Sequence, residues 1–237
     1  MIVDSLIEFR KKTRMIVEFR FKPISKIIDN RGHIVDGFIS KAKYQTSKYK
    51  ITNLGIVIQG DTSDVPTNIL IEPTRLSVDF EGHNLISHFD SEVKNVMAIF
   101  ANSMSLEAFN IRRVGVRFIS IFGFHKLLDY NKLISCFMAS YLNDNFPLSI
   151  KPGDLKFVFT SSNSNITLGP VKDDDKWITD NFSNKSGAPK VGIGLDVDSF
   201  ITKTIDNISI QDVLGMFEKL EEVTLQSETE AVNPFRV

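Results

Sequence analysis

The chain has 237 residues, of which 42% are hydrophobic and 24% are charged, and these proportions are those of an ordinary globular protein. Lys plus Arg (28) nearly balance Asp plus Glu (29), which disfavours a nucleic-acid binder that works through a wide basic surface. The single cysteine, Cys136, excludes an intramolecular disulfide, and no stretch approaches the ~20 apolar residues of a membrane span. We therefore expect a cytoplasmic protein with no membrane association.

The first half of the chain is predicted to form strands and then a helix. Stretches rich in Val, Ile, Phe and Tyr and bounded by turn residues predict strands over 16–21, 34–44, 49–59 and 76–80. Apolar residues then recur every three or four positions, which predicts an amphipathic helix over 91–108.

The second half is predicted to alternate strands and helices. We expect a strand over 112–122, a helix over 129–142, short strands over 155–160 and 165–168, and a strand over 190–197. Residues 161–164 suit a hairpin loop, 172–176 an exposed turn and 181–189 a further loop. Ser209, with Asp212 three residues later, is typical of the start of a last helix, and the polar tail over 226–237 is expected to be loosely held.

The predicted strands outnumber the helices, and most gaps between them are too short for parallel crossovers. The fold class that follows is α+β, with a largely antiparallel sheet and helices packed on one face. One compact unit over 1–237 is expected. The segments 17–21 (VEFRF) and 114–118 (VGVRF) resemble each other, so two pseudo-repeated halves over 15–108 and 109–225 are a further hypothesis.

Four segments together resemble a sporadically distributed bacterial family of uncharacterised proteins of about this length. They are 19–21 (FRF), 71–80 (IEPTRLSVDF), 113–119 (RVGVRFI) and 194–198 (GLDVD). The residues after Leu225 depart from the family pattern. The family has no established activity to carry over. Its patchy distribution implies genes that travel with mobile elements or phage-defence loci.

Strand alternation predicts one polar face. In the strand over 112–122, Val114, Val116 and Phe118 share one side and Arg113 the other. If this strand, the first strand over 16–21 and the strand over 190–197 are neighbours, the side away from the core carries Arg and Asp side chains around glycines, which weaken strands unless something approaches the backbone closely. The candidate binding residues are Arg20, Arg113, Gly115, Arg117, Gly192, Gly194, Asp196 and Asp198.

Two other interpretations of these residues stay open. The charges can be cross-strand ion pairs on a solvated face, each contributing little. Asp196 and Asp198 project together and could contribute to a divalent-metal site, but the sequence supplies no assignable third ligand. We therefore expect no metal and no cofactor.

No catalytic residue can be assigned, because the chain lacks a phosphate-binding glycine loop, a nucleophile elbow and a kinase signature. Gly192 and Gly194 lack the third glycine and the helix of a dinucleotide fingerprint. The basic residues Arg10, Lys11, Lys12 and Arg14 are either a solvated helix end or a nucleic-acid contact. The four histidines, which suit exposed loops or packing better than zinc binding, are His33, His83, His88 and His125.

The leading functional hypothesis is a non-enzymatic binding or interaction module, an accessory component of a bacterial mobile-element or phage-defence system. A protein partner or a second copy of the chain is expected, and nucleic acid is possible but not favoured. The alternative is an enzyme, a metal- or carboxylate-dependent hydrolase acting on nucleotides or nucleic acid. The absence of any nucleophile, base and orienter set in the sequence places the binding module first.

Overall fold

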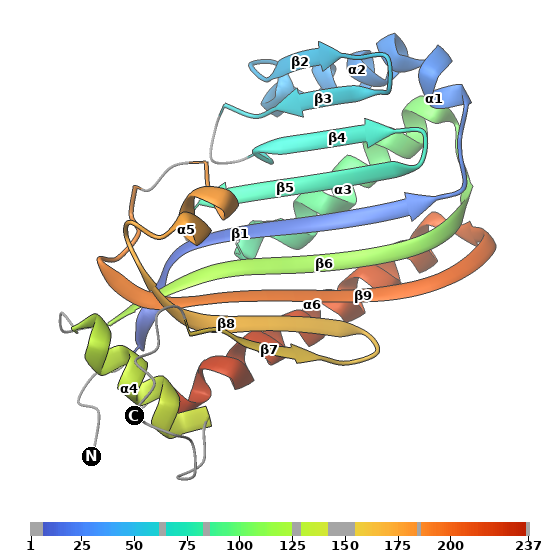
Figure 1. Cartoon of the computed structure of the whole chain (residues 1–237). Coiled ribbons are helices and arrows are strands. Elements are labelled where there is room, and N and C mark those ends of the chain that lie inside the picture. Colours follow the sequence, from blue (N-terminus) through green and yellow to red (C-terminus); the bar gives the residue numbers. More distant parts are fainter. Residues whose placement is uncertain are drawn as a thin grey trace.

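A computed structural model describes residues 7–61, 65–82, 86–124, 129–141, 155–183 and 186–235. Over these residues, nine strands form one open, antiparallel sheet in the order β2-β3-β4-β5-β1-β6-β9-β8-β7. Helices α3 and α6 lie along one face of the sheet, behind it in Figure 1, and the short helix α5 lies on the opposite face. The α+β class with an antiparallel sheet is therefore confirmed.

The first half builds one side of the sheet. Its elements are β1 (Ile7–Phe21), α1 (Lys26–Asp29), α2 (Arg31–Ile39), η1 (Ala42–Tyr44), β2 (Lys48–Ile51), β3 (Ile56–Gln59), β4 (Asn68–Glu72), β5 (Arg75–Gly82) and α3 (Ile86–Met104). The second half builds the other side. Its elements are β6 (Ala108–Phe124), α4 (Tyr130–Tyr141), β7 (Phe157–Thr160), β8 (Ser164–Lys172), α5 (Lys176–Asn181), β9 (Val191–Ser209), α6 (Ile210–Val232) and η2 (Asn233–Phe235).

The core lies between the sheet and its helices. Alternate residues of β1, β5 and β6 point to the helix side, and these are buried: examples are Phe19, Val78 and Val116. A ring cluster joins the layers, because Phe89 of α3 contacts Phe118 of β6 and Phe217 of α6 at centroid distances of 5.7 and 5.8 Å. This alternation fixes the register, since a slip of one residue would expose every one of these side chains.

The two halves share an order of elements. β1, α2, the meander β3-β4-β5 and α3 correspond in order to β6, α4, the meander β7-β8-β9 and α6. In each half the last meander strand pairs antiparallel with the first long strand, and β1 and β6 pair with each other at the centre. Among the elements that the structure describes, β2 has no counterpart in the second half. Whether the halves arose by duplication stays a prediction.

Several predicted elements are wrong in type or length. The segment predicted as a strand over 34–44 forms α2 and η1, and its buried residues Ile34, Val35 and Phe38 have helical spacing. The strand predicted over 49–59 is the hairpin of β2 and β3. The strand predicted over 190–197 runs on to Ser209, and β4 and α5 were not predicted.

The polar tail is also corrected. Helix α6 continues to Val232, and Val232 and Phe235 are buried against α4 and β9. Ser120 of β6 donates a hydrogen bond to Glu228 within this contact. At the start of α6 the expected cap is present, because the Ser209 hydroxyl accepts a hydrogen bond from the Asp212 amide at 3.1 Å. Within the described residues, no helix is both long enough and apolar enough to cross a membrane.

Candidate binding site on the open face of the sheet

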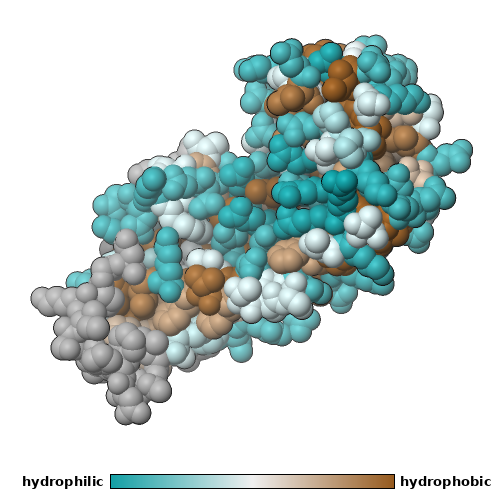
Figure 2. Space-filling view, turned by 45° about the vertical axis from the view of Figure 1, so that its right-hand side comes forward, coloured by the Kyte–Doolittle hydropathy of each residue, from teal (hydrophilic) through white to brown (hydrophobic). Residues whose placement is uncertain are grey.

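We call the side of the sheet that faces away from α3 and α6 the open face. One end of it is covered by α5, where Ile119, Ile121, Val171, Ile178 and Phe182 form a small apolar cluster. The rest carries charged side chains from β4, β5, β1, β6 and β9. Figure 2 shows that hydrophilic residues dominate the central part of this surface.

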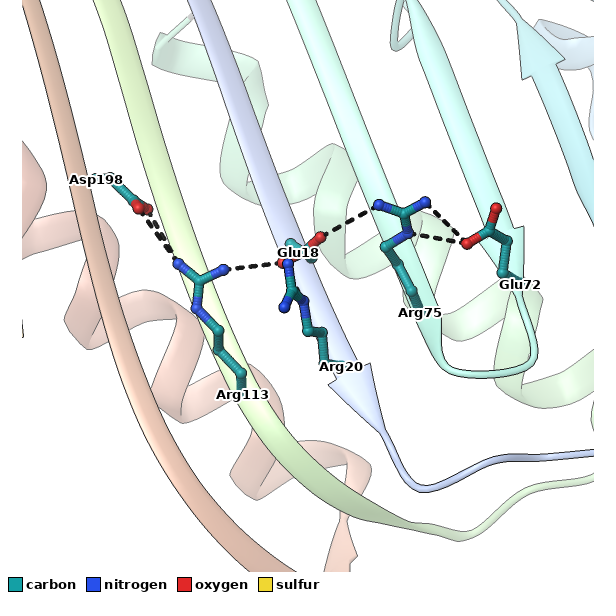
Figure 3. Close-up of polar contacts among 6 residues, drawn as sticks. All are labelled: Glu18, Arg20, Glu72, Arg75, Arg113 and Asp198. Carbon is teal, nitrogen blue, oxygen red and sulfur yellow. Dashed lines mark hydrogen bonds and ion pairs between the residues drawn. The ribbon is translucent and has the colours of Figure 1, made fainter.

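Glu18 of β1 is the centre of the charged part (Figure 3). Its carboxylate accepts hydrogen bonds from Arg20 at 2.7 Å and Arg113 at 3.0 Å, and Arg75 lies 3.7 Å away. Three arginines lie side by side around Glu18, because the strand register places Arg20 directly opposite both Arg75 and Arg113. Like charges in directly opposed positions destabilise a sheet, so Glu18 offsets a repulsion that the register imposes.

Arg113 is held on several sides. Its guanidinium also pairs with Asp198 of β9 at 3.3 Å and lies 5.0 Å from the centre of the Phe200 ring. It folds back over Gly115, where an added Cβ would lie 3.3 Å from Arg113 Nη2. Because Gly115 has no side chain, the Arg113 guanidinium can lie over it.

Arg117 and Asp196 form a separate pair on the same face. Arg117 donates from Nε at 2.8 Å and from Nη2 at 2.6 Å, a two-pronged geometry that is among the strongest ion-pair arrangements. The pairing is diagonal, because the register places Arg117 opposite Asp198. The hydrogen bond to Asp196 raises the pKa of Arg117, and burial raises the pKa of Asp198 against the opposing charges of Arg113 and Arg117.

The other predicted glycines lie elsewhere. Gly192 and Gly194 are buried under the α5 end of the face, and an added Cβ on Gly194 would lie 3.0 Å from the Trp177 ring and 2.7 Å from Val171. An added Cβ on Gly192 would lie 2.4 Å from the Phe122 carbonyl oxygen. The prediction that these two glycines form an open floor between the charges is therefore wrong: Gly194 makes room for Trp177 of α5, and Gly192 makes room for the backbone of β6.

The basic cluster near the N-terminus is part of β1 and not a helix end. Lys12 is 4% exposed and pairs with Glu81 at 3.1 Å. Arg14 donates to both oxygens of Asp79, from Nε at 2.9 Å and from Nη2 at 2.6 Å. Burial raises the pKa of Asp79, with Arg14 acting in the opposite direction. The side chains of Arg10 and Lys11 lie outside the described residues.

A hollow of about 510 Å³ lies at the end of the open face, beside the Glu18 network. We call it the arginine hollow. Its charged lining consists of four arginines and one carboxylate, and its full lining is Arg20, Phe21, Glu72, Thr74, Arg75, Arg112, Arg113 and Thr202. Within this lining, Glu72 accepts hydrogen bonds from Arg75 Nη2 at 2.8 Å and from Arg75 Nε at 3.1 Å.

Arg112 reaches the hollow because β6 is irregular there. The pairing of β1 with β6 shifts between Arg20, which is opposite Arg113, and Phe21, which is opposite Ile111, so Arg112 is an extra residue on β6. A bulge of this kind re-aims a side chain, which explains how two consecutive arginines line one hollow. Simple alternation would have placed Arg112 on the helix side.

Sequence reasoning therefore missed Glu18 as an acceptor, and it missed Glu72, Arg75 and Arg112 altogether. The available signals were the turn 72–75 (EPTR), which brings an acidic and a basic residue together between two strands, and the doubled arginine 112–113. Neither has a periodicity that would mark it as part of a site.

The potential metal-binding residues that the structure describes do not form a cluster. Within the described parts of the chain, no group of three His, Cys, Asp or Glu residues could hold a metal ion. Asp196 and Asp198 are instead engaged by Arg117 and Arg113. His33 and His88 are exposed, and His83 and His125 lie outside the described residues.

Comparison with known proteins gives no family. No protein-family model matches the chain, and no curated protein matches it. Among solved structures, a rolling circle replication initiator protein from Geobacillus stearothermophilus is similar over 91% of this chain and 80% of that chain, with 9% sequence identity and a TM-score of 0.33. A likeness this weak carries no argument about function.

Proposed function

We propose that the protein is a non-enzymatic binding module whose open face receives an anionic group of its partner. The observation that carries this proposal is the arginine hollow, which has four guanidinium groups and one carboxylate in its lining. The chain as a whole is close to neutral, so this gathering of arginines is local and not a consequence of composition. The resemblance of four sequence segments to a patchily distributed bacterial family supports a role as an accessory component of a mobile-element or phage-defence system.

The geometry supports recognition more than catalysis. Arg75 and Arg113 are held by Glu72, Glu18 and Asp198, so the walls of the hollow are fixed before any partner arrives. Guanidinium groups recognise oxyanions through paired N–H donors. No observation among the described residues favours the hydrolase alternative.

The test uses the two most solvent-facing arginines of the hollow. Arg20→Glu with Arg112→Glu reverses their charge without touching the buried core, since both residues are exposed. Lys48→Glu with Lys50→Glu, on the exposed edge strand β2, is a matched control with the same change in net charge. Tagged proteins are expressed in the organism from which the gene comes, and a captured partner is then purified and mixed with each variant.

The proposal expects a partner that binds the unmodified protein and the lysine control and that is lost from the arginine variant. Both variants must retain the thermal unfolding midpoint of the unmodified protein to within a few degrees. A partner retained equally by a folded arginine variant would show that the open face is not the binding surface.

A further inference from the structure

Two arginines of the hollow keep most of their hydrogen-bonding capacity. Among the described residues, the Arg112 side chain makes no hydrogen bond or ion pair, and the Arg20 side chain donates only from Nε to Glu18. Each guanidinium has five N–H donors, so about nine donors of this pair are free for a ligand. The Arg20 side chain is 52% exposed, which keeps those donors accessible.

The other two arginines form the fixed part of the site. The side chains of Arg75 and Arg113 are 36% and 22% exposed, and their carboxylate partners occupy several of their donors. Their positive charge still reaches the hollow, because each lines it. Counting the carboxylates that pair with these arginines, Glu18, Glu72 and Asp198, four positive charges meet three negative ones.

We propose that the arginine hollow binds the phosphate or pyrophosphate group of a small phosphorylated ligand, an inference that rests on the proposed function and names its ligand class. A single carboxylate would compete poorly here, because Glu18 and Glu72 already supply carboxylates to Arg20 and Arg75. A phosphate group carries up to about two charges and more oxygen acceptors, which suits two guanidiniums with free donors.

A small ligand is favoured over a nucleic-acid strand by the extent of the positive charge. The volume of about 510 Å³ falls in the range of small-molecule sites, roughly 300–1,000 Å³. Beyond the hollow, the arginines of the open face are matched by acids: Arg117 pairs with Asp196, and Arg14 pairs with Asp79. As far as its residues are described, the face therefore has no basic track that could follow a polynucleotide backbone.

Isothermal titration calorimetry in low-salt, phosphate-free buffer tests this inference with three probes: inorganic pyrophosphate, a hexaglutamate peptide and a ten-residue oligothymidylate. The variant is Arg20→Gln with Arg112→Gln, and the matched control is Lys48→Gln with Lys50→Gln. Pyrophosphate should bind the unmodified protein more tightly than hexaglutamate does. The arginine variant should lose at least about tenfold in pyrophosphate affinity, and the lysine control should stay within about twofold.

The other outcomes overturn the inference in distinguishable ways. Hexaglutamate binding that depends on the arginines and exceeds pyrophosphate binding would reject phosphate and leave the anion-binding function standing. Oligothymidylate binding far tighter than pyrophosphate would reject a small ligand. Pyrophosphate binding that is absent, or equal in the folded arginine variant, would reject the hollow as a phosphate site, while the partner-capture experiment would still decide the proposed function.

Discussion

The open face has two ends that the same strands build differently. At the α5 end, β6 presents Ile119 and Ile121, and these side chains are buried with Ile178 of α5. At the other end the same face of the same strand presents Arg113 and Arg117, with 22% and 41% of their side-chain surface exposed. The change from apolar to charged residues thus follows the presence of the covering helix.

This difference separates two kinds of polar group. Under the α5 end, Lys12 and Glu81 have only 5% and 9% of their side-chain surface exposed, and their ion pair belongs to the packing of that end. At the uncovered end the arginines outnumber the acids that line the hollow, and two of them keep free donors. Arginines that lack carboxylate partners, at a place where no helix covers the sheet, indicate a binding site for a ligand.

The largest effect is expected at the covered end. Ile178→Ala removes a fully buried side chain from the α5 cluster and should lower the free energy of unfolding by about 3 kcal/mol, through lost burial and the cavity left behind. Denaturant unfolding followed by fluorescence measures it, because Trp177, the single tryptophan, packs beside Phe182 in this cluster. A loss below about 0.5 kcal/mol would mean that α5 is not docked.

A smaller effect is expected at the uncovered end. Glu18→Gln removes the carboxylate that holds three arginines and should cost about 1 kcal/mol of stability, because the opposed arginines are left unbalanced. The same change should tighten pyrophosphate binding severalfold, since one competing negative charge is lost. Calorimetry on Glu18→Gln, with Glu107→Gln as an exposed control, distinguishes this from a general gain of positive charge. Weaker pyrophosphate binding would contradict the competition.

A carboxylate on the helix face, that of Glu221 in α6, makes no side-chain hydrogen bond or ion pair among the described residues. Burial raises its pKa to about 7, with the carboxylates of Asp90 and Glu218 adding and Lys94 opposing. The folded protein then holds a proton that the unfolded chain releases near pH 4.5, so this group's contribution to stability falls between pH 4.5 and about 7.

Glu221→Gln should remove that fall. Relative to the unmodified protein, the variant should gain about 1 kcal/mol in unfolding free energy between pH 4.5 and 8, a figure reduced to allow for partial exposure to solvent. Urea unfolding at a series of pH values measures it. A difference between the two proteins that is constant with pH would contradict the raised pKa.

The smallest effect concerns Gly115. Gly115→Ala places a methyl group about 3.3 Å from the end of the Arg113 side chain, which is flexible enough to move, so the stability change should stay within about 0.5 kcal/mol. The displaced Arg113 should nevertheless interact less strongly with Asp198. A double-mutant cycle between Arg113→Gln and Asp198→Asn, measured with Gly and with Ala at position 115, should show a smaller coupling energy with Ala.

The sequence predicts the regular parts of this molecule and misses the places where local and tertiary preferences conflict. Strand β6 follows from its alternation, and α3 from its apolar spacing. The first part of β1 was missed because Lys12 and Arg14 do not resemble a buried strand until Glu81 and Asp79 of β5 are placed beside them. Residues 34–44 are rich in β-branched and aromatic side chains, but tertiary packing against α3 holds them as helix.

The candidate site was predictable only in its alternating part. Arg20, Arg113, Arg117, Asp196 and Asp198 all lie on the open face, at positions that alternation specifies. Arg112 depends on a bulge and Arg75 on a tight turn, and neither feature has a period in the sequence. The burial of Gly194 beside Trp177 depends on α5, a six-residue helix without a strong pattern of its own.

A pyrophosphate titration, followed by the side-chain Nε–Hε signals of the arginines in a ¹H–¹⁵N NMR spectrum, shows which arginines bind the ligand. We expect concentration-dependent shifts for Arg20 and Arg112, with little change for Arg14 and Arg117, whose two-pronged pairs with Asp79 and Asp196 are complete. Signals of all four arginines that move equally, or not at all, would contradict the claim that the arginine hollow is the binding site.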